Sequence, residues 1–237
     1  MARTRQGRSL VEDVHKALRS DIMLGRRLPS SRLQLNELAE EHDVSLSVVR
    51  EAVTRLASED LVEATPQRGF RVRSISIGHL RDLTWVRIEI ETLALRQSIA
   101  KGDITWEANL AAAHHRLSVT PMYFEDGSGN TEWMAAHGEF HAALAAGAGS
   151  PVLERLRRQL YDASELYRYW SGNLPNHPTR EHVPDEHTGI FDAALARDAD
   201  LAVELLTQHL EATARHLEAI ASEVDTSDAT DLAAVVD

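Results

Sequence analysis

Apolar residues recur at helical spacing in two short stretches between residues 33 and 60. The first stretch places Leu35, Leu38 and Ala39 on one helical face. Val44 follows where a tight turn would end, and the second stretch then repeats apolar residues at Val48, Val49, Ala52, Val53 and Leu56. This spacing predicts two amphipathic helices that share one small core.

Two strand-like segments follow the second helix. Residues 61–64 and 70–73 are separated by Thr65-Pro66-Gln67-Arg68-Gly69, whose composition is typical of a turn. Two helices followed by such a hairpin predict a winged helix-turn-helix, which is a DNA-binding fold. In such motifs the N-terminal residues of the second helix enter the major groove.

Residues 10–73 resemble the N-terminal domain of the GntR family of bacterial transcription regulators. The resemblance rests on the segments Leu38-Ala39, Val44-Ser45 and Val49-Arg50-Glu51-Ala52, and on Pro66 with Arg68-Gly69 in the wing. It implies binding to double-stranded DNA. Family members commonly carry an arginine directly after the Val-Ser pair, but this chain has Leu46 there, so the family's operator specificity does not transfer.

The resemblance also indicates which residues face DNA. Arg50 stands on the outer face of the recognition helix, where arginine contacts bases or phosphates. Arg68 and Gly69 at the wing tip are expected in the minor groove, with glycine allowing close backbone approach. Two interpretations stay open for Asn36, Ser45 and Ser47, which would either bind phosphate or serve as helix caps and solvated surface.

Beyond residue 78 almost every segment has helical periodicity. The pattern predicts helices over residues 79–101, 104–117, 131–146, 151–170, 185–197 and 198–223, with a loop near 121–130. We therefore expect a mainly α protein with a winged helix-turn-helix at 1–73, a linker at 74–78 and an antiparallel all-α helical bundle at 79–223. Residues 224–237 are expected to form an acidic, partly disordered tail.

Charge is divided unequally between the two predicted domains. Residues 1–73 carry a net charge of +2, whereas residues 74–237 carry −14. DNA binding must therefore come from a local basic face, with help from Arg3, Arg5 and Arg8 on an N-terminal tail. The chain has no cysteine, no apolar run long enough for a membrane helix and no secretion signal at its start, so we expect a cytoplasmic protein without membrane contact.

Histidines in the predicted bundle form a candidate metal site. His137 and His141 are four residues apart and so share one helical face, while His187 and His209 lie on two later helices joined by a short turn. A histidine on an apolar face is more often a hydrogen-bonded core residue than a ligand. The spacing of one pair alone does not decide between these interpretations.

The same region resembles the FCD effector-binding domain of the FadR subfamily, most closely over residues 186–209. Many members of that subfamily bind a divalent metal through an aspartate and three histidines. The resemblance implies that His141, His187 and His209 are the histidine ligands, and this chain has His137 where the aspartate usually stands. Four neutral imidazoles favour zinc or nickel over magnesium or calcium.

Arg87 is the expected effector-binding residue, since arginine recognises carboxylates well. The alternative is a simple ion pair with Glu91, four residues along the same helix. Together these features predict a homodimeric transcription regulator, in most such cases a repressor, that binds a pseudo-palindromic operator and responds to a small carboxylate effector. The alternatives are a direct sensor of a divalent metal or a metal-dependent enzyme fused to a DNA-binding domain; we expect no enzyme activity.

Overall fold

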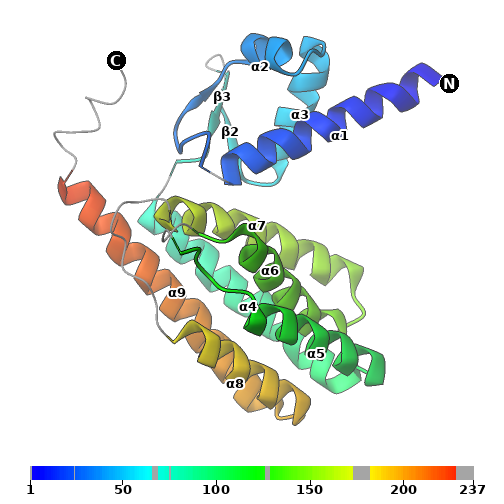
Figure 1. Ribbon diagram of the computed structural model, residues 1–237, viewed down its shortest axis with the longest axis vertical. Helices are drawn as coiled ribbons and strands as arrows, with labels where there is room; N and C mark the ends of the chain where they lie inside the picture. The colour runs from blue at the N-terminus through cyan, green and yellow to red at the C-terminus, as the bar shows by residue number, and fades with distance from the viewer. Residues whose placement is uncertain are drawn as a thin grey trace. The chain divides into compact units, whose positions relative to one another are not determined.

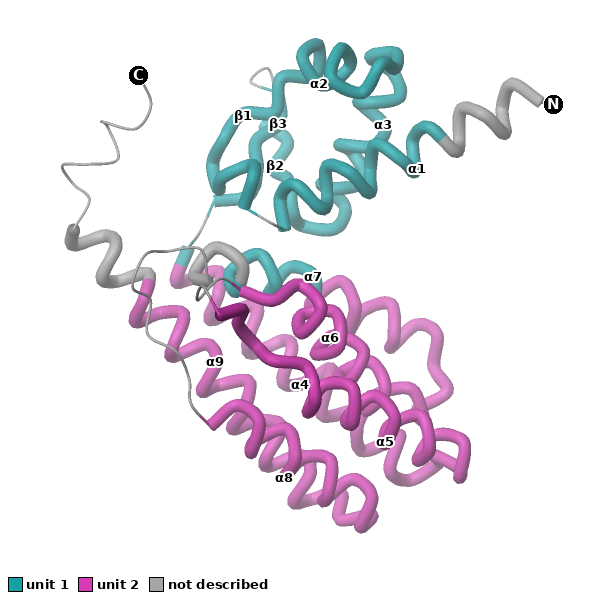
Figure 2. The backbone as a smooth tube through the Cα atoms, in the orientation of Figure 1, with its two compact units in different colours: residues 1–76, 162–170 teal, residues 77–161, 171–237 magenta. Residues whose placement is uncertain are grey.

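The computed structural model describes residues 2–23, 25–65, 69–74, 76–125, 129–172 and 182–227. Within them the chain is mostly helical, with one small antiparallel sheet (Figure 1). The chain divides into two compact units, which are described separately (Figure 2). Unit 1 comprises residues 1–76 and 162–170, and unit 2 comprises residues 77–161 and 171–237. The mainly α fold predicted from the sequence is confirmed.

Unit 1 contains the predicted winged helix-turn-helix. It includes α1 (Ala2–Met23), α2 (Leu35–Glu41), α3 (Leu46–Ser58) and the strands β1 (Arg32–Leu33), β2 (Val62–Thr65) and β3 (Gly69–Val72). The sheet has the order β1-β3-β2 and both strand pairs are antiparallel. The short strand β1 is a feature that the sequence analysis does not anticipate.

The core of unit 1 is built by the apolar face of α3. Val49, Ala52, Val53 and Leu56 are fully buried and pack with Leu18 of α1. Burying a Leu or Val side chain contributes about 1.5–3 kcal/mol each. The inner face of α3 is thus fixed by packing, which leaves the opposite face exposed.

The N-terminus of α3 differs from the expectation for Ser45. This residue occupies the N-cap position with extended backbone angles, but its side chain makes no capping hydrogen bond. Its Oγ instead lies 2.9 Å from Oγ of Ser47. Both hydroxyls are therefore on the surface, beside each other, at the start of the helix.

Unit 2 is a bundle of helices. It contains α4 (Ile77–Lys101), α5 (Ile104–Val119), α6 (Thr131–Ala146), α8 (Val183–Leu195), α9 (Ala199–Ser227) and the first half of α7 (Pro151–Gly172). Helix α4 packs against α6 and α9, α5 packs against α6, and α8 runs beside α9 (Figure 1). Phe140, Leu110, Ile190 and Leu206 are buried at its centre.

Several predicted boundaries need correction. Helix α4 begins at Ile77, so residues 77 and 78 of the predicted linker form its first turn. Helix α9 continues to Ser227, so the first four residues of the predicted tail are helical; residues 228–237 lie outside the described part. Residues 2–9, expected as a tail, belong to α1, although the side chains of Arg3, Arg5 and Arg8 are not described.

Candidate functional site

The outer face of α3 forms the first candidate site. Ser45, Leu46, Ser47 and Arg50 are all exposed there, and Leu46 retains 41% of its accessible surface. These residues adjoin a groove that runs between α3, the start of α2 and the sheet, lined by Arg32, Leu33, Gln34, Leu35, Asn36, Leu46, Arg50 and Gly69. Four of the predicted DNA-facing residues, Asn36, Leu46, Arg50 and Gly69, thus line one groove.

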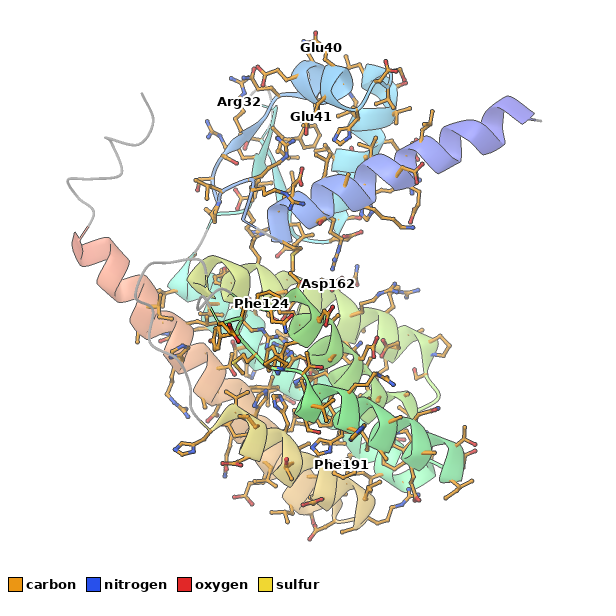
Figure 3. The ribbon with its side chains drawn as sticks, viewed as in Figure 1. Arg32, Glu40, Glu41, Phe124, Asp162 and Phe191 are labelled. Atoms are coloured by element: carbon orange, nitrogen blue, oxygen red, sulfur yellow. The ribbon has the colours of Figure 1, made fainter. Side chains whose placement is uncertain are left out.

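Two arginines of this groove carry uncompensated charge. Arg50 and Arg32 are exposed and make no ion pair within the described residues, whereas Arg55 of the same helix pairs with Glu51 at 2.7 Å. Arg32 lies on β1 (Figure 3), where its Cα pairs with that of Arg71 in β3. The sequence analysis misses Arg32 because nothing in the linear pattern shows that a two-residue strand brings it beside α3.

The wing tip is described only in part. Gly69 has a φ angle of +86°, and a Cβ atom built there would meet nothing within 4 Å. The glycine is therefore required by its left-handed backbone conformation and not by close packing in the protein. Arg68, predicted to enter the minor groove, lies outside the described residues.

Four buried histidines form the second candidate site, in unit 2. His137 and His141 on α6, His187 on α8 and His209 on α9 are each at most 2% exposed. Their candidate ligand atoms all lie within 4.8 Å of one another. Two nitrogen ligands of a tetrahedral zinc ion, with Zn–N bonds of about 2.1 Å, are roughly 3.4 Å apart. The candidate ligand atoms thus lie slightly farther apart than around a bound ion, a difference that small rotations of the rings would close.

The outer nitrogens of three of these histidines face oxygen atoms. Nδ1 of His209 lies 2.7 Å from Glu186 Oε2, and Nδ1 of His137 lies 2.9 Å from the hydroxyl of Tyr161. Nδ1 of His141 lies 3.3 Å from Glu91 Oε2. Metal-bound histidines almost always place their second nitrogen against such a partner, because it fixes the ring and the tautomer. With Nδ1 placed in this way, Nε2 is the nitrogen that each of these three rings would offer to a metal ion.

His141 provides the clearest indication that the centre suits a cation. Its Nε2 is buried and has no hydrogen-bonding partner among the described residues. Burial lowers the pKa of His141 to about 3, against the opposing effect of Glu91, so the ring is neutral near pH 7. A buried neutral imidazole without a partner is costly in a core but is suited to metal ligation.

Glu91 is a buried carboxylate that links two parts of the site. Burial alone would raise its pKa, but the charge of Arg87, the contact with His141 and the charge of Arg157 outweigh burial and hold the pKa far below its usual value. Arg87 binds it through Nε at 2.7 Å and Nη2 at 2.6 Å. Both side chains are at most 5% exposed. The predicted alternative for Arg87, an ion pair with Glu91, is therefore present, and both of its side chains are buried.

Comparison with known proteins adds two family matches. Residues 10–72 match the model for bacterial regulatory proteins of the gntR family, and residues 82–212 match the FCD domain. The two matches together cover most of the chain. The chain belongs to the GntR family.

Relatives of this GntR protein are named as transcription regulators. It is 38% identical to the HTH-type transcriptional regulator BphR of Paraburkholderia xenovorans, over 87% of this chain and 84% of that protein. It is 33% identical to the HTH-type transcriptional repressor GlaR of Escherichia coli, over 84% and 91%. These relatives and both families are regulators and not enzymes.

Solved structures share the fold. A GntR transcriptional regulator of a Rhodococcus species has a TM-score of 0.70 at 27% identity, covering 89% of this chain and 98% of that one. Escherichia coli McbR/YncC has a TM-score of 0.71 at 21% identity, covering 88% of this chain and 97% of that one.

Among the described helices of this GntR protein, none has the length and apolar character that crossing a lipid bilayer needs.

Three residues near the histidine cluster escaped the sequence analysis of this GntR protein. Tyr161 has no signal in the sequence that singles it out, yet its hydroxyl contacts His137. Glu186 directly precedes His187 and contacts His209, the residue 23 positions along the chain. Glu91 was considered only as the partner of Arg87. Of the three, only Glu186 had a signal in the sequence, because it directly precedes His187. Tyr161 and Glu91 reach the histidines from distant segments of the chain.

Proposed function

We propose that this GntR protein is a transcriptional repressor whose operator binding is controlled by a small carboxylic acid held in a metal-containing FCD domain. The observation that carries the proposal is the cluster of four buried histidines, whose candidate ligand atoms lie within 4.8 Å of one another and three of which have Nδ1 against an oxygen atom. A protein core gains little from four neutral imidazoles packed together without an ion. Repression rests on the name of the relative GlaR.

The proposed ion is zinc or nickel. Imidazole nitrogens suit these borderline metals, whereas magnesium and calcium prefer oxygen ligands. His137, His141, His187 and His209 would supply the ligands, with Glu91, Glu186 and Tyr161 as their supports. The ion would supply a fixed positive charge that attracts an oxygen of the effector.

Arg87 is proposed as the protein group that orients the effector. Its guanidinium lies 5.4 Å from the ring centroid of Tyr161, whose hydroxyl contacts His137. Glu91 already matches its charge, and the planar guanidinium of Arg87, with five N–H groups, can bind an effector carboxylate as well. The pair of Arg87 and Glu91 would attract an organic acid, and it would leave no buried charge unpaired when the acid is absent.

The proposed DNA contacts lie on α3, β1 and the wing. Arg50 and Arg32 would contact bases or phosphates, and Ser45, Ser47 and Asn36 would contact phosphates. Arg68 and Gly69 would approach the minor groove. We propose a homodimer in the cytoplasm, since two-fold symmetry matches a pseudo-palindromic operator. Effector binding need only favour one arrangement of the DNA-binding domains by a few kcal/mol to change operator occupancy greatly.

A mobility-shift titration tests this proposal. The purified protein is titrated on the intergenic DNA upstream of its own gene, with elemental analysis of the same preparation and repeats in the presence of candidate organic acids. Salt-sensitive binding by a dimer that contains about one metal ion per chain, relieved by one acid, is the expected result. Metal-free protein that gives no specific shift would contradict the proposal.

The second candidate is a direct metal sensor, which the completeness of the four-histidine set favours. Removing the metal ion and then adding it back distinguishes the metal sensor from the proposed acid-responsive repressor. A sensor loses or gains operator binding when the free metal is varied alone. The proposed repressor retains its ion through purification and responds to an acid at constant metal.

A further inference from the structure

Arg157 is a second buried arginine in unit 2. Its side chain is only 4% exposed. Its Nε and Nη2 each donate to the carboxylate of Glu154 at 2.8 Å, while Nη1 is buried and has no hydrogen-bonding partner among the described residues. A guanidinium has five N–H groups, and burying it with some of them unsatisfied costs free energy. Arg157 thus has unused donor capacity inside the bundle.

This unused donor lies close to the histidine cluster. The guanidinium of Arg157 is 5.9 Å from the ring centroid of Tyr161, and that of Arg87 is 5.4 Å from the same ring. The hydroxyl of Tyr161 contacts Nδ1 of His137. The charge of Arg157 also acts on Glu91, which contacts His141. Both arginines therefore border the same interior region.

The charges of this region do not balance once an ion is present. Arg87 is matched by Glu91, and Arg157 is matched by Glu154, whose side chain is 44% exposed. The four histidines would contribute no negative charge to a divalent ion. Glu186, whose carboxylate lies 2.7 Å from Nδ1 of His209, supplies one compensating negative charge. At least one positive charge is then left for the ligand to neutralise.

We infer that the effector of this protein carries two carboxylates, one of which binds the metal ion beside Arg87 while the other binds Nη1 of Arg157. The inference rests on the proposed function, because it assumes the metal-containing effector site. It assigns Arg157 as the group that distinguishes a dicarboxylate from a monocarboxylate. A dianion would place one carboxylate on the ion and the other on the unused donor, whereas a monoanion would leave Nη1 of Arg157 unsatisfied.

The test compares matched ligands on the intact protein. Zinc-loaded protein of known metal content is titrated by calorimetry with straight-chain dicarboxylates of increasing length and with the monocarboxylates of the same lengths. We expect at least one dicarboxylate to bind roughly ten- to a hundredfold more tightly than its monocarboxylate, as for a charge-assisted hydrogen bond in a buried site. Equal affinity for both classes would overturn the inference while leaving the proposed function intact.

Two variants assign the effect to Arg157. Arg157→Gln is expected to remove the difference between the classes by weakening only the dicarboxylate. Arg158→Gln is the matched control, since Arg158 is the next residue on α7 and is exposed. Equal weakening of both classes by Arg157→Gln would contradict the assignment. Should this variant fail to fold, the comparison of ligand classes on the unaltered protein still decides the inference. Zinc-loaded protein that binds neither class would overturn the proposed function itself.

Discussion

The hydroxyl oxygen of Tyr161 lies 2.9 Å from Nδ1 of His137, and both side chains are buried. The resemblance to the FCD domain implies an aspartate at the position of His137, so this contact would support a proposed ligand that departs from that pattern. When Nε2 faces an ion, Nδ1 carries the proton and donates to the tyrosine oxygen. Tyr161 thereby selects the tautomer that a metal needs.

Removing this hydroxyl should weaken metal binding without removing a ligand. We expect Tyr161→Phe to lower zinc affinity about tenfold, at the lower end of the effects known for groups that support metal ligands. Competition with a chromogenic chelator measures the change. Unaltered affinity would show that His137 is oriented by packing alone.

Glu91 should support His141 in a comparable way. Glu91→Gln is expected to lower zinc affinity about 10- to 100-fold. It should also reduce the free energy of unfolding by several kcal/mol, because Arg87 would remain buried without its partner. Glu89→Gln is the control, since Glu89 is exposed on the same helix. The prediction fails if both variants bind zinc alike in chelator competition.

Replacing His137 by aspartate should change which metal is preferred. His137→Asp adds one negative charge and an oxygen ligand, so we expect affinity to move from zinc and nickel toward manganese and magnesium. Competitive loading followed by elemental analysis measures the preference. His115→Asp on exposed helix surface should leave it unchanged. A retained preference for zinc would mean that the other three histidines decide selectivity.

Arg50 should contribute directly to operator affinity. Arg50→Ala is expected to cost about 1–3 kcal/mol of binding, the value of a good arginine contact to a base. Fluorescence anisotropy on operator DNA measures the loss. Arg55→Ala, one turn further on and paired with Glu51, should cost much less. Equal losses would place the recognition surface elsewhere on α3.

At Leu46 a DNA contact can be added, whereas the Arg50 variant removes one. Leu46→Arg restores the residue that similar proteins commonly carry at an exposed position of α3. One added phosphate contact should steepen the slope of log affinity against log salt by about 0.9. Anisotropy at a series of salt concentrations gives this slope. An unchanged slope would indicate that position 46 does not reach the DNA backbone.

Local patterns in the sequence predicted most of the fold, but not every detail of unit 1. The apolar spacing of Val49, Ala52, Val53 and Leu56 predicted α3 because a helix repeats every 3.6 residues. Strand β1 was missed because two residues are too few to show alternation. Capping, one of the two interpretations left open for Ser45, is not observed because its hydroxyl contacts Ser47. Composition does not reveal which of two local partners a hydroxyl takes.

The candidate metal site was predicted only as far as its own residues. The spacing of His137 and His141 and the family resemblance indicated which histidines to expect together. Their supports come from other elements: Glu91 from α4, Tyr161 from α7 and Glu186 from α8. The partly unsatisfied guanidinium of Arg157 likewise depends on how distant helices pack. Such contacts carry no periodic signal along the chain, so they required the structure.

The pairing of β1 with β3 has a consequence for how an operator would be selected. It aligns Arg32 with Arg71 and joins the segment before α2 to strand β3 of the wing by backbone pairing, which restrains the movement of β3 away from α2. A wing restrained in this way would adjust little to the local width of the minor groove. DNA stiffness would then contribute to operator selection. Base pairs that no side chain touches, between the contacted positions, would still affect affinity, because bending the DNA costs more free energy for some sequences than for others.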